Sequence, residues 1–141
     1  RIEADEDCLN LEALLLNYTK DRISKKFAGP APKFIRAMEK FKSASEYSFI
    51  VEAKNADGDI IAMMYFWVHG TSATYQIGWT DKAGRDARAH YAMMWATMKF
   101  LKKKNIRWLD LGGINPDTAE GVTRFKKGLG GNMFETAGIY A

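Results

Sequence analysis

Residues 60–68 read IIAMMYFWV, an uninterrupted apolar run. A run without polar alternation is typical of a central strand that is covered on both faces. Asp57 and Gly58 precede it as a turn of the kind that closes a hairpin, and the segment before that turn, YSFIVEAK, alternates like a half-buried strand. The sequence HGTS at residues 69–72 then turns the chain into a third strand, ATYQIGW. The sequence therefore predicts a three-stranded antiparallel meander over residues 47–79.

A long helix is expected after the meander. Asp86 is its expected N-cap, and the three lysines at residues 102–104 suit the negative end of its dipole. RWLDL, at residues 107–111, indicates a short strand, and a helix between two strands normally makes those strands parallel neighbours. We therefore expect residues 108–111 to pair in parallel with the strand that ends near Trp79.

The flanking segments complete the expected order of elements. Apolar spacing predicts a helix over residues 8–27 and a second helix that begins at Pro32. Residues 115–128 indicate a short helix, and residues 132–141 a last strand. The fold class that follows is α/β (α+β), with a mixed sheet built from the meander, a β-α-β crossover and a final strand.

Composition indicates a single domain. The chain has 141 residues, of which 47% are hydrophobic, and its one cysteine, Cys8, favours a reducing compartment. No apolar run is long enough to span a membrane, which predicts a cytoplasmic protein. The net charge of +4 suits an anionic partner such as a nucleotide or RNA. Because the chain starts at Arg1 and not at methionine, the possibility that it is a fragment of a longer polypeptide is also open.

Several classes of enzyme chemistry lack their sequence patterns. The two histidines, His69 and His90, are far apart, and no Cys/His/Asp cluster has metal-ligand spacing. Walker, G-x-S-x-G and G-x-G-x-x-G patterns are missing as well. What remains is the pair Gly112 and Gly113 at the end of a strand, where glycine marks either a tight turn or the close approach of a ligand.

The order of helix, meander and crossover resembles the GNAT acyltransferase fold. The second half resembles more narrowly the FemABX-type branch, in the segments GWTDKAGRDARAHYAMMW, LDLGGIN and GVTRFKKGLGG and in Glu135. Members of that branch transfer aminoacyl groups from aminoacyl-tRNA to peptidoglycan precursors. The resemblance thus implies a cytoplasmic transferase of cell-wall biosynthesis, with no cofactor beyond its donor substrate. Such members carry two GNAT-like halves. This chain resembles the second half, and we expect residues 1–141 to form one GNAT-like domain.

The resemblance also implies roles for individual residues. The family pattern places Phe-Lys, here Phe125 and Lys126, at the acyl donor, where the lysine would polarise the donor carbonyl. The flanking cations Arg124 and Lys127 are either donor contacts or solvated charges. Asp110 and Glu135 are the acid/base candidates, although no carboxylate pair is evident. Amides near Gly112 and Gly113 are expected to stabilise the oxyanion.

Arg85 and Arg88, at the start of the long helix, are either the phosphate contact of tRNA or coenzyme A or part of a solvated loop. His90 is counted with the donor-binding residues and is either a general base or a structural or surface residue. Acetyl-CoA enzymes of the GNAT fold place a glycine where this chain has Arg88, so we expect free acetyl-CoA to bind weakly. Trp67 and Trp108 are predicted to be core residues, as is Trp95.

Two alternative functions remain open. One is an acyl-CoA-dependent N-acyltransferase of a small molecule, which would bind coenzyme A and not tRNA. The other is a non-catalytic basic RNA-binding module, which the sequence favours less because no surface strand interleaves aromatic residues with cations.

Overall fold

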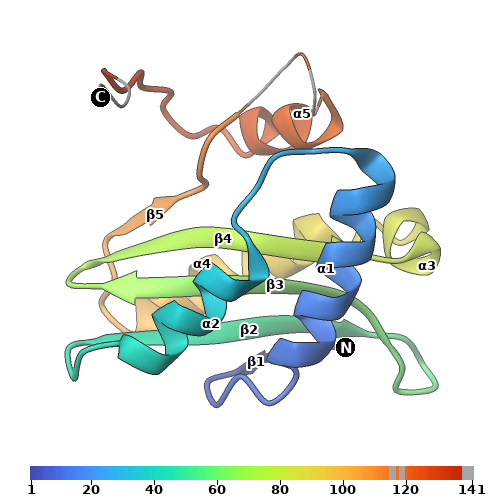
Figure 1. The fold of residues 1–141 in the computed structure, drawn as a ribbon, viewed down its shortest axis with the longest axis horizontal. Helices are drawn as coiled ribbons and strands as arrows, with labels where there is room; N and C mark the ends of the chain where they lie inside the picture. Colours follow the sequence, from blue (N-terminus) through green and yellow to red (C-terminus); the bar gives the residue numbers. More distant parts are fainter. Residues whose placement is uncertain (115–116, 118–119, 138–141) are drawn as a thin grey trace.

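The protein is described by a computed structural model, which covers residues 1–114, 117 and 120–137. Five strands and five helices are formed in these residues (Figure 1). In chain order they are β1 (Ile2–Asp5), α1 (Leu11–Lys25), α2 (Pro32–Phe41), β2 (Glu46–Lys54), β3 (Ile60–His69), β4 (Ser72–Thr80), α3 (Lys82–Asp86), α4 (Ala89–Lys103), β5 (Trp108–Asp110) and α5 (Glu120–Gly128).

The strands form one sheet in the order β1-β2-β3-β4-β5. The first four strands are antiparallel neighbours, and β5 pairs in parallel with β4 through Ser72 opposite Trp108 and Thr74 opposite Asp110. The predicted meander and the predicted parallel pair are both confirmed. The crossover helix α4 is long enough to return the chain to the same end of the sheet, which is why the pair is parallel.

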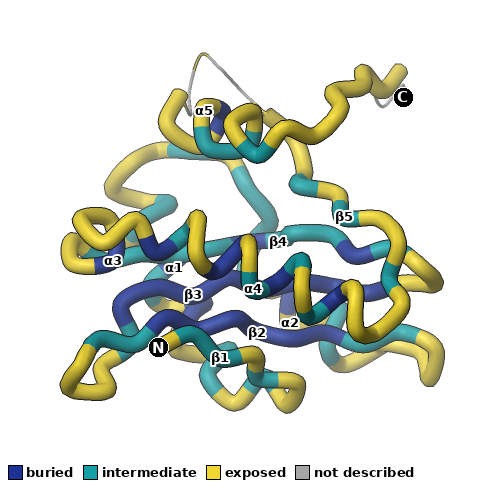
Figure 2. Tube along the Cα trace, turned by 180° about the vertical axis from the view of Figure 1, so that it is seen from behind, coloured by how far each residue is buried: buried dark blue, intermediate teal, exposed yellow. Residues whose placement is uncertain are grey.

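Helices cover both faces of the sheet (Figures 1 and 2). α4 packs on one face over a core that includes Phe49, Met64 and Phe66. α1 and α2 pack on the other face over a second core that includes Tyr65 and Trp67. Alternate side chains of β3 enter the two cores, and this is why its apolar run is unbroken.

A β-bulge in β4 changes which way its side chains point. Tyr65 pairs with Ile77, whereas its neighbour Phe66 pairs with Tyr75, so Gln76 is an extra residue on β4. Ile77 consequently packs in the core under α1 and α2, and Tyr75 packs in the core under α4. Tyr75 thus keeps the face of Ala73, which carries α4, and the bulge moves Ile77 and Trp79 to the opposite face.

A polar cluster fastens α2 to the sheet. The carboxylate of Glu39 accepts hydrogen bonds from Tyr65 at 2.6 Å, from Lys42 at 2.8 Å and from Ser48. Although burial opposes it, these donors lower the pKa of Glu39. The Sγ of Cys8 lies 3.6 Å from the Oγ of Ser48, and burial raises the pKa of this thiol to about 11.

Several expectations about elements were wrong. The chain begins with a strand, β1, which has only four residues and carries two acids. The expected strand over residues 132–141 is not formed at residues 132–137, and its last four residues lie outside the described part. Asp86 does not cap the long helix. It ends the separate helix α3, which Asp81 caps, and α4 begins after Arg88.

Two of the predicted core tryptophans lie on the surface. Trp67 is buried as expected, but Trp95 is 62% exposed and Trp108 is 70% exposed. α4 turns its methionines, among them Met93 and Met94, to the sheet, which leaves Trp95 on the outer side. Trp108 lies on β5, the edge strand, where a side chain has a neighbouring strand on one side only.

Candidate active site

The candidate site lies where β4 and β5 separate. β5 pairs with β4 only as far as Thr74 opposite Asp110. Beyond that pair β4 continues to Thr80, whereas the segment that follows β5 turns away from it. Tyr75 is the first residue of β4 beyond the pairing, and Gly112 passes beside its backbone. A Cβ on Gly112 would lie 3.4 Å from the carbonyl oxygen of Tyr75. The two backbones are therefore still close at the point where the strands part.

Lys126 reaches this point from α5. Its Nζ donates a hydrogen bond to the carbonyl oxygen of Gly113 at 2.8 Å and lies 5.6 Å from the centre of the Tyr75 ring. Burial lowers the pKa of Lys126, and the negative charge of Asp110 acts in the opposite direction. The site thus holds a partly desolvated cation with a carbonyl oxygen as its hydrogen-bond acceptor.

The turn after β5 is shaped by Gly112. Its φ of 75° is left-handed, and its N–H donates to Oδ1 of Asp110 at 2.7 Å. The Gly112 amide is therefore already engaged, contrary to the expectation that it would face an oxyanion. The N–H of Gly113 donates to none of the described residues, which leaves it the better amide for that task.

Phe125 connects Lys126 to the start of α4. Its ring packs edge-on against His90 with centroids 5.7 Å apart and against Tyr91 with centroids 4.9 Å apart. Burial lowers the pKa of His90, so its imidazole is neutral at pH 7. His90 consequently contributes a packed ring beside the site and carries no charge there.

Tyr75 in the site, and Thr123 on the helix that carries Lys126, had not been singled out in the sequence. Tyr75 supplies the ring beneath Lys126, and it lies on the same face of β4 as Ala73. Thr123 lies one helical turn before Lys126 and is 5% exposed. Its Oγ1 makes no hydrogen bond within the described part of the chain. A buried hydroxyl without a partner is uncommon and leaves a donor and an acceptor free for a ligand.

The other predicted site residues lie apart from Lys126. Arg124 is exposed and pairs with Glu120 at 3.0 Å, and Lys127 is exposed on the same helix. Glu135 is exposed in the segment that follows α5. Arg85 donates to the carbonyl oxygen of Thr80 from α3.

Arg88 is the N-cap of α4, with a left-handed φ of 51°. The backbone there has the conformation that glycine prefers, although the residue is arginine. Its side chain is exposed.

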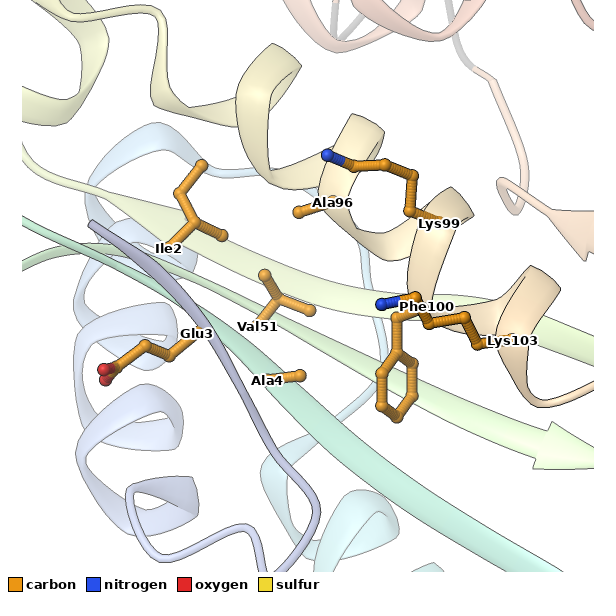
Figure 3. A pocket seen from close by; sticks show the side chains of 8 residues that line it. All are labelled: Ile2, Glu3, Ala4, Val51, Ala96, Lys99, Phe100 and Lys103. Atoms are coloured by element: carbon orange, nitrogen blue, oxygen red, sulfur yellow. The ribbon is translucent and has the colours of Figure 1, made fainter.

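Cavities and metal ligands do not mark another centre in the part that the structure describes. A hollow of about 260 Å³ lies between β1 and α4 (Figure 3), and another of about 630 Å³ lies between α1 and α2. Both are away from Lys126. The described residues contain no group of three His, Cys, Asp or Glu side chains placed to hold a metal ion. No described helix combines the length and the apolar character that crossing a bilayer requires.

Solved structures with this fold are numerous, and the three described next are distant in sequence. An acetyltransferase of the GNAT family from Staphylococcus aureus Mu50 has a TM-score of 0.68 and 15% identity, covering 92% of this chain and 84% of its own. A ribosomal-protein-alanine N-acetyltransferase from Brucella melitensis biovar Abortus 2308 has a TM-score of 0.67 and 11% identity, covering 100% and 99%. A transcriptional regulator from Bacillus halodurans C-125 has a TM-score of 0.65 and 18% identity over the full length of both chains.

At these identities the likeness establishes the fold, which is the GNAT fold expected from the sequence. Among proteins with curated functions, none matches the chain. A family model described as the FemAB family matches residues 5–141, which include the β4–β5 junction, Phe125 and Lys126. This match extends over nearly the whole chain, and the chain belongs to the FemAB family.

Proposed function

We propose that the protein transfers an aminoacyl group from aminoacyl-tRNA to an amine on a peptidoglycan precursor, and that it does so in the cytoplasm. The donor and acceptor classes are those of the FemAB family. The observation that supports the chemistry is the hydrogen bond from Lys126 to the carbonyl oxygen of Gly113 at 2.8 Å. A half-buried ammonium that already binds a carbonyl oxygen can bind the carbonyl oxygen of a donor ester instead.

The reaction consists of attack by the acceptor amine on the ester carbonyl carbon. A C–N bond forms, and the carbonyl oxygen becomes an oxyanion that Lys126 and the N–H of Gly113 stabilise. The oxyanion collapses, the C–O bond to the ribose breaks, and the proton of the amine passes to the departing ribose oxygen. The proton passes directly between the substrates in this proposal because Glu135, the acid/base candidate, makes no contact with Lys126 and is not placed to take it.

Asp110 has a supporting role in this proposal. Its Oδ1 is engaged by the Gly112 amide, and its charge raises the pKa of Lys126 against the effect of burial. Asp110 therefore helps to keep Lys126 protonated, and thus able to donate, while the turn holds Gly113 in place. Thr123, whose hydroxyl has no hydrogen-bond partner among the described residues, is the further residue that we assign to the donor.

The test compares Lys126→Ala, Lys126→Arg and Lys127→Ala with the native protein. The readout is transfer of a labelled aminoacyl group from aminoacyl-tRNA to a precursor peptide with a free amine. Lys126→Ala should slow transfer roughly a hundredfold, the usual effect of losing one oxyanion donor, and Lys126→Arg should retain part of the rate. Lys127 is exposed on another side of α5 and serves as the control. Equal rates in all four proteins would refute the proposal.

The second candidate donor is acyl-CoA, which the acetyltransferases with the same fold favour. Against it stands Arg88, whose side chain occupies the place of the glycine that admits a pyrophosphate in acetyl-CoA enzymes. We predict weak binding of acetyl-CoA in calorimetry. Tight and specific binding would instead establish coenzyme A as the donor.

A further inference from the structure

The outer face of α4 carries a line of aromatic and cationic side chains that the proposed chemistry does not use. Residues at successive turns of this face share exposure and lie within about 40° of one common direction around the helix. They are Arg88, Tyr91, Trp95, Lys99 and Lys102, here named the α4 stripe. From the first to the last, fourteen positions at 1.5 Å each give a length of about 21 Å.

The aromatic members of the stripe are held with their rings available. Trp95 is 62% exposed, Tyr91 is 47% exposed, and the Nζ of Lys99 lies 6.0 Å from the centre of the Trp95 ring. A cation beside the ring restrains the indole without covering it from solvent. The expectation from the sequence concerned surface strands only; here the aromatic residues and cations alternate on a helix, since Trp95 is exposed and was wrongly expected in the core.

The segment that carries the stripe has no opposing charge, and Glu3, which lines the same hollow as Lys99, pairs with Lys54 at 2.8 Å. Residues 87–109 contain no aspartate or glutamate, but they contain six lysines and arginines. The carboxylates that flank this segment have partners, since Asp86 pairs with Lys82 at 2.7 Å and Glu6 pairs with Lys104 at 2.8 Å. Figure 3 shows that Lys99 and Lys103 extend from α4 over the edge that faces β1. An anionic ligand is therefore attracted along the whole helix.

The stripe leads to the candidate active site. Tyr91 packs against Phe125 with ring centroids 4.9 Å apart, and Phe125 directly precedes Lys126. A strand that lies on Trp95 and Tyr91 would thus have its end next to the ammonium of Lys126. This is the arrangement that a polymer needs when it carries its reactive group at one end.

We propose that the α4 stripe binds single-stranded RNA next to the aminoacyl ester, with bases stacked on Trp95 and Tyr91 and phosphates on Arg88, Lys99 and Lys102. The proposal rests on the proposed function for the identity of the donor. Unpaired bases stack on exposed aromatic rings, whereas the bases of a duplex are already stacked on each other. A stripe of about 21 Å is long enough for about six nucleotides at ~3.4 Å each.

An anionic membrane is the other partner that aromatic residues and lysines would suit. Membrane-surface helices bury a face that includes large aliphatic side chains. On α4 the helical neighbours of Trp95 are Tyr91, Ala92, Met98 and Lys99. Met98 packs against the core, and the exposed large apolar residues of this helix are Tyr91 and Trp95 themselves. The composition of the face therefore favours bases over lipid.

The experiment measures binding of a six-nucleotide single-stranded RNA ending in CCA to the full chain by fluorescence anisotropy. Trp95→Ala should weaken binding roughly ten- to a hundredfold, and Trp95→Phe should retain most of it. Lys99→Gln should lower the slope of log K against log salt by about 0.7 for each phosphate contact that is lost. Since these side chains are exposed, the variants should melt at the native temperature.

α2 offers a matched control on the other side of the sheet. Phe41 is 75% exposed, and the Nζ of Lys40 lies 5.3 Å from its ring, so the pair has the same chemistry as Lys99 and Trp95. Phe41→Ala should leave RNA binding unchanged. Equal affinity of the native protein and Trp95→Ala would overturn the proposal, as would an equal loss in Phe41→Ala.

Two further outcomes separate this proposal from its rivals. Trp95-dependent binding to phosphatidylglycerol vesicles, with RNA binding indifferent to Trp95, would overturn it in favour of a membrane surface. RNA binding is measured without any transfer. Trp95-dependent binding without transfer from any donor would refute the proposed function alone, and transfer with binding indifferent to Trp95 would refute the α4 stripe alone.

Discussion

The Nζ of Lys126 on α5 lies 2.8 Å from the carbonyl oxygen of Gly113 and so joins α5 to the turn that follows β5. The contact links residues thirteen positions apart, at the place where two parallel strands separate. Because the ammonium is partly desolvated, its charge costs stability in the folded chain. The same feature that makes Lys126 a strong donor therefore has consequences for stability that can be measured.

Replacing Lys126 by Met should reduce the dependence of the free energy of unfolding on alkaline pH. Burial lowers the pKa of Lys126 below its ordinary value of 10.5, so between these two values the unfolded chain binds more protons than the folded one. The free energy of unfolding of the native protein should therefore rise with pH in that window, and this rise should be smaller in Lys126→Met. Urea unfolding between pH 7 and pH 10.5 measures it. Lys127→Met is the control, and a rise of the native size in Lys126→Met would contradict the assignment.

Gly112→Ala should destabilise the protein by about 1–2 kcal/mol. The cost comes from the left-handed φ of 75°, which an L side chain adopts with strain. The new Cβ would also lie 3.6 Å from the Nζ of Lys126. In Gly113→Ala the Cβ would meet no atom within 4 Å, so its cost should stay under ~0.5 kcal/mol. Urea midpoints of the two variants decide the matter, and similar values would show that the turn tolerates a side chain.

His90 should make stability depend on pH below neutrality. Burial lowers the pKa of His90 from its ordinary value of 6.5, so the unfolded chain takes up a proton first as the pH falls. Stability from this group is complete above pH 6.5 and is lost as the pH falls toward the folded pKa, by at most about 1.4 kcal/mol per unit. His90→Gln should remove that slope in unfolding experiments at pH 7, 6 and 5. The exposed His69 provides the control, and an unchanged slope in His90→Gln would assign it to another group.

Cys8 should react slowly with iodoacetamide in the folded protein. Burial raises the pKa of its thiol from 9.0 to about 11, and two units of pKa lower the thiolate fraction at pH 8 about a hundredfold. Alkylation followed by mass spectrometry should show a rate at least about a hundredfold below that in 8 M urea, where the thiol has its ordinary environment. Comparable rates in the two conditions would show that the thiol is accessible and ionised.

The sequence predicted the centre of the sheet better than its edges. The long apolar run and the Asp57-Gly58 turn define the meander locally, and the crossover rule then makes β5 parallel to β4. β1 was missed because four residues with two acids carry no strand pattern, and it is formed only by pairing with β2. Such an edge depends on long-range contacts that the local sequence does not encode.

The residues of the candidate site that belong to a recognisable sequence motif could be predicted. Lys126 and the two glycines were singled out from their motifs, but Tyr75 was not, since only the long-range placement of Lys126 on α5 brings a cation over its ring. Trp95 was wrongly expected in the core because helical spacing of apolar residues does not show which face of the helix packs on the sheet. Which face packs on the sheet is decided by the fit of the whole helix.

The short pairing of β5 has a consequence for the way the molecule opens. Nine residue pairs join β2 to β3, whereas three join β5 to β4. Separation of β5 therefore requires the loss of few hydrogen bonds, and it should occur far more often than global unfolding. In native-state hydrogen exchange, the amides of β5 should exchange through this local opening, while those of β3 should wait for the entire sheet to unfold. A bulky substrate could then be admitted beside Lys126 through motion of one edge strand, with the antiparallel sheet acting as a fixed support.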